Sequence, residues 1–180
     1  MALLQRTGSY GSYWGDEQNS SHSLTQSQME VNATYIYNYL TAQGWTVNAI
    51  AGMLGNMQHE SSINPGRWQG DNVGVGPGYG LVQWTPYTKY TDWNGIVGDY
   101  STMDNNIARI LYEVANHIQW YATPSYQMTF SEFTQSTQTP YYLACAFAWN
   151  YERSAIVISG TPAEQEELRR RRGGSAENWY

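Results

Sequence analysis

A glycine-rich stretch between Pro65 and Pro86 constrains the fold of this chain more than any other feature. Within it the apolar spacing typical of a helix disappears, and glycines alternate with bulky residues. These are Gly66, Gly70, Gly74, Gly76, Gly78 and Gly80, interleaved with Trp68, Val73, Val75, Tyr79 and Val82. Such alternation between prolines favours short strands and turns, so we predict a small β-hairpin region there.

Two helices are predicted before this stretch. The first covers residues 27–43, with apolar residues at helical spacing and Gly44 placed to end it. The second covers residues 46–60 and begins with a threonine as N-cap. Gly52 and Gly55 lie inside the second helix and lower its helix propensity. Glycines at such positions indicate the close approach of another backbone or of a ligand.

Four further helices are predicted after the glycine-rich stretch. One has an apolar stripe, and three begin with a threonine that can cap the first turn. They are a helix over residues 103–120, a short helix begun by Thr129 and Glu132, a helix begun by Thr139 and Pro140, and a last one begun by Thr161 and ended by Gly173 and Gly174. Together with the β-hairpin they make an α+β domain that is mainly helical.

The chain has 180 residues, which suits one compact domain. Residues 1–26 are polar and lack an apolar period, so we predict an arm or linker there and a folded domain over residues 27–180. Charged residues make up 13% and the net charge is −6, which disfavours nucleic acid as a partner. No segment is long enough to span a bilayer, so no membrane insertion is expected.

Glu60 is the candidate general acid. It ends the predicted helix 46–60, and a rotation of about 100° per residue places it on the same face as Ala49, Met53 and Met57. A general acid must keep its proton near neutral pH, which requires a partly desolvated place against apolar groups. The pattern therefore suggests a carboxyl that protonates a glycosidic oxygen. The alternative is a solvated glutamate at a helix end.

Other chemistry has less support in the sequence. Three histidines occur without the spacing of a zinc site, so neither a metal nor another cofactor is expected. Cys145, the single cysteine, lies in apolar sequence and is predicted to be a buried structural residue. The arginines of residues 169–172 either contact an anionic polymer or form a solvated helix face, and we favour the solvated face. Abundant Tyr and Trp suit sugar faces or protein interfaces equally.

Three segments together resemble the phage tail lysozymes, which are wall-degrading domains related to goose-type lysozymes and lytic transglycosylases. The segments are Glu60-Ser61 with Asn64-Pro65, then Gly80-Leu81-Val82-Gln83-Trp84-Thr85-Pro86, then Trp149-Asn150-Tyr151-Glu152-Arg153. The resemblance covers about residues 29–180. It departs from the family at Ser154, where proline is common.

The resemblance implies a lysozyme-like fold and a muramidase, a glycoside hydrolase that cleaves the β-1,4 bond between N-acetylmuramic acid and N-acetylglucosamine. It implies that Glu60 is the general acid and that the Gly-Leu-x-Gln segment lines the sugar cleft. Trp84 is either part of this cleft or part of the core. The substrate-binding candidates are Gln83, expected to hydrogen-bond the sugar, and the aromatic residues Trp68, Tyr79, Trp84 and Tyr151.

A second carboxylate decides the mechanism. An inverting hydrolase needs a base that activates water, roughly 6.5–9.5 Å from the acid. Asp71 lies eleven residues after Glu60, where goose-type relatives keep an aspartate; its other interpretation is a turn residue. A lytic transglycosylase needs no such base and leaves 1,6-anhydro ends. We favour hydrolysis, with transglycosylation and a non-catalytic glycan-binding or tail-structural module as alternatives.

The resemblance also implies a biological setting. The expected partners are bacterial peptidoglycan strands, and other phage tail proteins or further domains of a longer chain. The expected location is the virion, at the tail tip, from which a bacteriolytic enzyme acts on the host wall from outside. The lack of a secretory signal in the sequence agrees with delivery by a tail.

Overall fold

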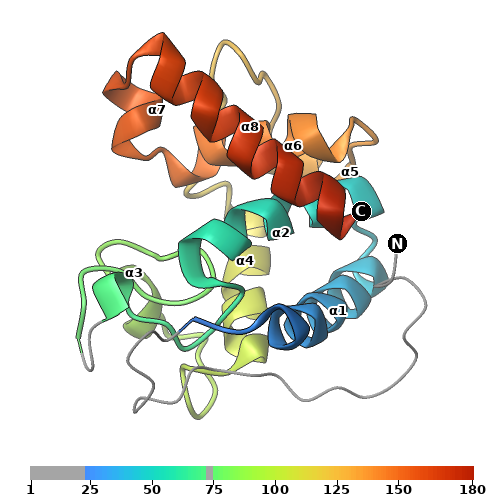
Figure 1. Cartoon of the computed structure of the whole chain (residues 1–180). Coiled ribbons are helices and arrows are strands. Elements are labelled where there is room, and N and C mark those ends of the chain that lie inside the picture. The colour runs from blue at the N-terminus through green and yellow to red at the C-terminus, as the bar shows by residue number, and fades with distance from the viewer. Residues whose placement is uncertain (1–22, 72–74) are drawn as a thin grey trace. The chain divides into compact units, whose positions relative to one another are not determined.

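A computed structural model describes residues 23–71 and 75–180 of the chain (Figure 1). These residues form helices joined by turns and loops. The helices are α1 (Gln26–Ala42), α2 (Val47–Ser61), the 3₁₀ turn η2 (Gln69–Asp71), α3 (Thr88–Thr91), α4 (Met103–Asn116), α5 (Phe130–Gln135), α6 (Pro140–Phe147), the π-helical turn η3 (Ala148–Glu152), α7 (Ala155–Ser159) and α8 (Pro162–Trp179).

The predicted β-hairpin is wrong. Within the described residues no strand is formed, and the glycine-rich stretch holds only isolated antiparallel bridges that pair Tyr79 with Trp68 and with Trp84. Gly80 and Gln83 have left-handed φ values of 83° and 50°, so the chain turns where a strand would continue. The described fold is therefore mainly helical rather than α+β.

The predicted helices before this stretch are confirmed. α1 ends at Ala42, and Gly44 follows with a left-handed φ of 84°. At the start of α2 the Thr46 hydroxyl accepts a hydrogen bond from the Ala49 N–H at 3.2 Å, as expected of an N-cap. The threonine caps of α5 and α8 are also present, each as a capping box.

Two helix ends differ from the predictions. α4 stops at Asn116 because His117 takes a left-handed φ of 55°, although the apolar stripe continues to Ile118. α8 continues past Gly173 and Gly174 to Trp179. A Cβ on Gly173 would lie 2.3 Å from the Tyr141 ring, so this glycine marks a close packing contact rather than a helix end. The short helices α3 and α7 were not predicted.

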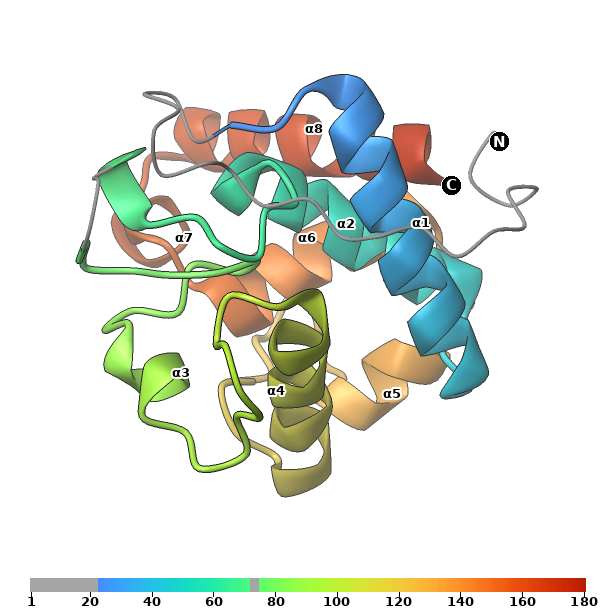
Figure 2. The same ribbon diagram turned by 90° about the horizontal axis from the view of Figure 1, so that it is seen from below.

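The described residues divide into two compact units. The first contains residues 23–36 and 57–112, and therefore Glu60 and the glycine-rich stretch. In this unit the loop after α3 runs beside α4 (Figures 1 and 2). The Asn105 amide holds it, accepting from the Val97 N–H and donating to the Val97 and Asp99 carbonyls. Its core is made by Met57, Ile63, Tyr79, Leu81, Val82, Trp84, Tyr90, Met103, Ile107 and Ile110.

The second unit contains residues 37–56 and 113–180. In it α8 lies across α6 (Figures 1 and 2). The glycines of α2 permit close helix packing, because a Cβ on Gly52 would lie 2.8 Å from Leu143 and one on Gly55 would lie 2.7 Å from the Arg172 carbonyl. The close backbone approach expected at both glycines is therefore present. An aromatic cluster of Trp45, Trp120, Phe130, Phe133, Phe147 and Tyr151 fills the core of this unit.

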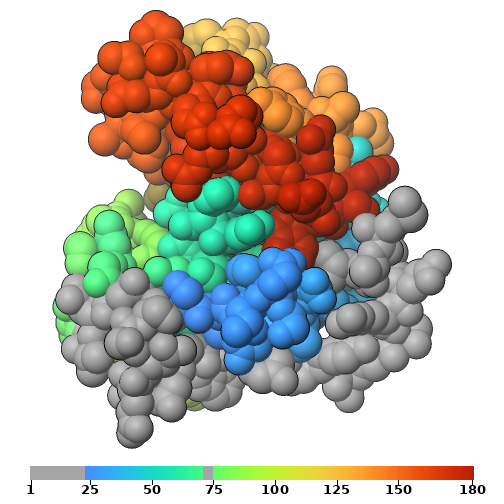
Figure 3. All heavy atoms as spheres, in the orientation of Figure 1, coloured from blue at the N-terminus to red at the C-terminus, as the bar shows by residue number. Residues whose placement is uncertain are grey.

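The surface of the second unit includes an uncovered apolar helix. α7 and the start of α8 lie together on the face shown in Figure 3. No side chain of α7 is buried, and Ile158 is 66% exposed. In the ranges 23–71 and 75–180, none of the helices has the length and the apolar character that crossing a bilayer would require.

Candidate active site

Glu60 lies in the last turn of α2, one residue before the helix ends. Its side chain is partly buried. Ser62 and Ile63 follow with left-handed φ values of 56° and 52°, and the Ile63 N–H donates to the Met57 carbonyl at 3.2 Å. This bond and the two left-handed residues end the helix and turn the chain, directly after the partly buried Glu60.

The Gly-Leu-x-Gln segment is tied directly to this end of α2. The hydroxyl of Ser61 donates to the Leu81 carbonyl at 2.9 Å, and the Leu81 N–H donates to Oδ1 of Asn106 on α4 at 3.0 Å. Ser61, Leu81 and Asn106 are all fully buried. Both backbone polar groups of Leu81 are therefore held by side chains, one from each of two helices.

Gln83 closes the turn of this segment. Its amide nitrogen Nε2 donates to the carbonyls of Arg67 at 3.0 Å and Gly80 at 2.8 Å. A glutamine amide carries two N–H donors, so both are used within the unit. A contact between Gln83 and a sugar would therefore use Oε1, which accepts a hydrogen bond from a hydroxyl or an N-acetyl N–H.

The three aromatic candidates of the glycine-rich stretch pack inside the unit. Tyr79 is 1% exposed and Trp84 is 2% exposed. The ring of Trp84 stacks on Tyr90 with centroids 4.6 Å apart and planes at 9°, and the ring of Trp68 lies 4.4 Å from that of Tyr79. Of the two alternatives for Trp84, the sugar cleft and the core, its position in the structure fits the core. Of the three, Trp68 has the greatest exposure, at 9%.

The remaining candidates lie elsewhere. The backbone of Asp71 belongs to η2, while its side chain lies outside the described part of the structure. Tyr151 belongs to the second unit, where it is buried, stacks on Phe147 with centroids 4.5 Å apart, and donates its hydroxyl to the carboxylate of Glu113. Tyr151 therefore has a polar partner within its own core.

The candidates for other chemistry have structural roles. Cys145 is buried, and burial raises the pKa of its thiol to about 11, so it stays protonated at neutral pH. The arginine run is only partly a solvated face. Arg170 pairs with Glu167 at the surface, but the Arg169 guanidinium lies 4.4 Å from the Trp149 ring centroid and Arg172 donates to the Asn56 carbonyl. Among the described residues, no group of three or more His, Cys, Asp or Glu side chains is placed to hold a metal ion.

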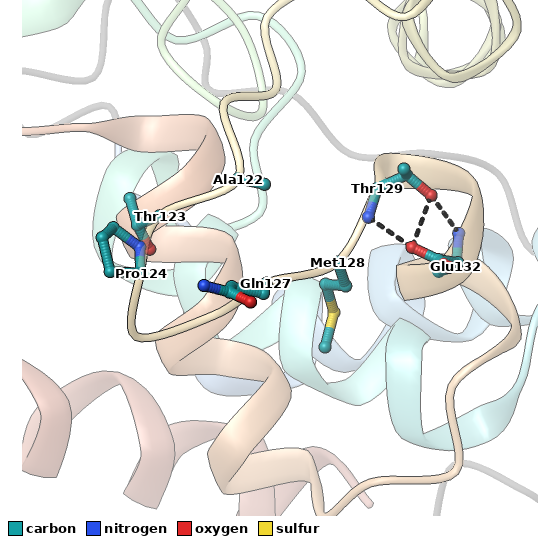
Figure 4. Close-up of a pocket in the computed structure, with 7 residues that line it drawn as sticks. All are labelled: Ala122, Thr123, Pro124, Gln127, Met128, Thr129 and Glu132. Carbon is teal, nitrogen blue, oxygen red and sulfur yellow. Dashed lines mark hydrogen bonds between the residues drawn. The ribbon is translucent and has the colours of Figure 1, made fainter.

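A surface hollow of about 420 Å³ lies in the second unit (Figure 4). It is lined by Ala122, Thr123, Pro124, Gln127, Met128, Thr129 and Glu132. Glu132 is the single ionisable residue in this lining, and Figure 4 shows its carboxylate bound to the Thr129 backbone N–H and hydroxyl. These bonds lower the pKa of Glu132, and the N–H contributes most. The carboxylate therefore serves the cap of α5.

The sequence analysis did not identify Asn106 and Tyr90. Asn106 binds the backbone of Leu81, and the ring of Tyr90 stacks on Trp84. Asn106 lies directly before Ile107 in the apolar stripe of α4, and a polar residue in a buried stripe is a signal that could have indicated it. Tyr90 had no comparable signal, because nothing in the sequence shows that its ring stacks on Trp84.

The sequence model of a family described as phage tail lysozyme matches residues 31–180. Morphogenesis protein 1 of Bacillus phage B103 is 49% identical over 161 residues, which cover 87% of this chain and 40% of that protein. The chain thus spans less than half the length of this curated relative.

Proposed function

Because the chain belongs to the phage tail lysozyme family, we propose that it is a muramidase that hydrolyses the β-1,4 bond between N-acetylmuramic acid and N-acetylglucosamine in peptidoglycan. The observation that carries this proposal is the hydrogen bond from Ser61 to the Leu81 carbonyl. It joins the residue after Glu60 to the Gly-Leu-x-Gln segment, twenty residues away in the chain. A proton donor and a sugar-binding segment must be held at a fixed spacing, and this bond supplies that constraint.

The proposed reaction uses two carboxyl groups. Glu60 donates its proton to the glycosidic oxygen as the C1–O bond breaks, and the leaving sugar departs with a new hydroxyl. Water attacks C1 from the opposite face and gives its proton to a base, for which we propose Asp71 on the basis of the sequence. Gln83 accepts a hydrogen bond from the sugar through Oε1 and helps to place the bond beside Glu60.

The proposed setting is a phage particle that opens the host wall. The relative in Bacillus phage B103 is named a morphogenesis protein, which supports a role for that protein in building the virion. We extend this to the present chain and place it at the tail tip. Its partners would be peptidoglycan strands, and other tail proteins or further domains of a longer chain.

The test is digestion of purified bacterial cell walls by this chain, followed by turbidity and by mass spectrometry of the released muropeptides. We expect clearing and products with reducing ends. Products lighter by one water would show 1,6-anhydro ends, and the reaction would then be that of a lytic transglycosylase. A folded chain that binds walls without clearing them would contradict the enzyme proposal and support a glycan-binding module.

A further inference from the structure

We propose that Asn106 is a positioning residue for the cleavage reaction, which fixes the Gly-Leu-x-Gln segment relative to the end of α2 that carries Glu60. This inference rests on the proposed function and deepens it. Asn106 does not contact the substrate in this proposal. It acts through Leu81 and Tyr90, and no motif of the sequence assigns it such a role.

The side-chain amide of Asn106 connects four segments of the first unit. Its Oδ1 accepts from the Leu81 N–H at 3.0 Å. Its Nδ2 lies within hydrogen-bond distance of the Pro65 carbonyl at 3.3 Å, the Tyr90 hydroxyl at 2.9 Å and the Thr102 carbonyl at 3.0 Å. One amide therefore links the turn after Glu60, the Gly-Leu-x-Gln segment, α3 and its own helix.

The backbone of the segment is shaped to receive this amide. Gly80 has a left-handed φ of 83°, and a Cβ at this position would lie 2.6 Å from Asn106 Oδ1. A larger residue at position 80 would push the amide and the segment apart. The Asn106 amide can therefore approach the backbone at position 80 only because glycine has no side chain.

Tyr90 extends the constraint to the aromatic residues of the stretch. Its hydroxyl accepts from Asn106 Nδ2 and donates to the Tyr100 carbonyl, and its ring stacks on Trp84. Burial, with a smaller contribution from Asp99, raises the pKa of Tyr90, so the hydroxyl remains protonated and continues to donate. Asn106 therefore orients the ring against which Trp84 packs.

Together these contacts fix the spacing between the end of α2 and the Gly-Leu-x-Gln segment. Ser61 holds the Leu81 carbonyl from α2, and Asn106 holds the Leu81 N–H from α4. Removing the Asn106 amide leaves a buried N–H without its acceptor, which favours a shift of the segment. A misplacement of about 1 Å can lower the rate on the order of 10²-fold, because the proton donor no longer meets the glycosidic oxygen.

The chain offers a matched control in Asn105, the neighbour of Asn106 on α4. Asn105 is also buried, and its amide also makes three backbone hydrogen bonds. Its partners are the N–H and carbonyl of Val97 and the carbonyl of Asp99, in the loop before α4. Asn105→Ala therefore removes a buried amide of the same kind without touching Leu81 or Tyr90.

The experiment compares Asn106→Ala and Asn105→Ala in the full chain, with cell walls and a soluble glycan fragment as substrates. The assay temperature is kept well below the thermal unfolding midpoint of either variant. We expect both variants to lose stability, while Asn106→Ala lowers kcat by about 10- to 100-fold with KM changed by less than about threefold. Asn105→Ala should keep kcat within about twofold of the wild type. Equal kcat values for two folded variants would overturn the positioning role.

Tyr90→Phe provides a second arm if Asn106→Ala does not fold. It keeps the ring that stacks on Trp84 and removes only the hydroxyl that accepts from Asn106. We expect kcat to fall by about three- to tenfold at unchanged KM, and an unchanged kcat would overturn the proposal. A wild-type chain that cleaves no glycan would instead contradict the proposed function itself, so the two failures are distinguishable.

Discussion

At the residue scale, the setting of Glu60 depends on the three residues after it in the chain. Ser61 is fully buried and binds Leu81, and the left-handed residues Ser62 and Ile63 prevent α2 from continuing. The backbone at this end of α2, which carries Glu60, therefore cannot move away from the Gly-Leu-x-Gln segment without breaking a buried hydrogen bond. A glutamate at an ordinary, solvated helix end has no such constraint.

We predict that Glu60→Gln lowers wall-lytic activity by a factor of roughly 10² or more, because the amide has nearly the same shape but cannot donate a proton to the leaving oxygen. The unfolding free energy should change little. Turbidity clearing and urea unfolding measure the two effects, and Glu177→Gln, at an exposed position of α8, serves as the control. Near-full activity in a folded Glu60→Gln variant would contradict the assignment.

Asp71 gives a second prediction at this scale. If it activates water, Asp71→Asn should lower the hydrolysis rate by a factor of about 10² or more, because the amide cannot accept the proton. Substrate binding should be retained, so the loss should be in kcat rather than in KM. Kinetics on a soluble glycan fragment would show this, and an unchanged kcat would place the base elsewhere.

At the element scale, the local signals in the sequence were reliable and the long-range ones were not. Threonine caps and apolar stripes located α1, α2, α5, α6 and α8, because a cap acts within one turn. The β-hairpin prediction was wrong because glycines alternating with aromatic residues resemble the pattern of a strand. In the structure, the Trp84 ring stacks on Tyr90 and the Trp68 ring meets Tyr87 edge to face. Gly173 was misread because its contact with Tyr141 is tertiary.

In the candidate site, too, features that are local in sequence could be predicted and long-range contacts could not. Glu60, Gln83 and Trp84 could be named from one short motif each, since each motif is local in sequence. The polar residue in the apolar stripe could have drawn attention to Asn106, but its partners could not be named, because they lie 41, 25 and 16 residues away. Only the fold shows that one amide serves all three.

The packing of α2 against α8 gives a prediction with opposite signs at two glycines. Gly55→Ala would place a Cβ 2.7 Å from the Arg172 carbonyl and 2.8 Å from the Ala176 nitrogen, both of them backbone atoms. We expect a loss of about 1–3 kcal/mol, which outweighs the gain in helix propensity. Gly174→Ala, within α8 and facing open space, should gain about 0.5–1 kcal/mol. Urea unfolding measures both, and a stabilised Gly55→Ala variant would contradict the tight crossing.

At the scale of the whole molecule, the family match begins within α1. The match starts at residue 31, and α1 starts at Gln26. Just before α1, Leu24 is buried, and Thr25 and Gln28 form reciprocal bonds in which the Thr25 N–H donates to the Gln28 side chain at 2.9 Å. Among the described residues, these contacts of Leu24, Thr25 and Gln28 hold the start of α1.

Two truncations test whether this part is sufficient for activity. A chain of residues 23–180 keeps Leu24 and the start of α1, so its unfolding free energy should stay within about 0.5 kcal/mol of the full chain and its wall-clearing rate should be unchanged. A chain of residues 30–180 lacks the buried Leu24 and Met29 side chains and the Thr25–Gln28 bonds, and we expect a loss of about 3–6 kcal/mol from burial and capping together. Slower clearing by a fully stable 23–180 chain would instead show that residues 1–22 contribute to wall binding, because stability and the proposed catalytic residues are the same in both chains.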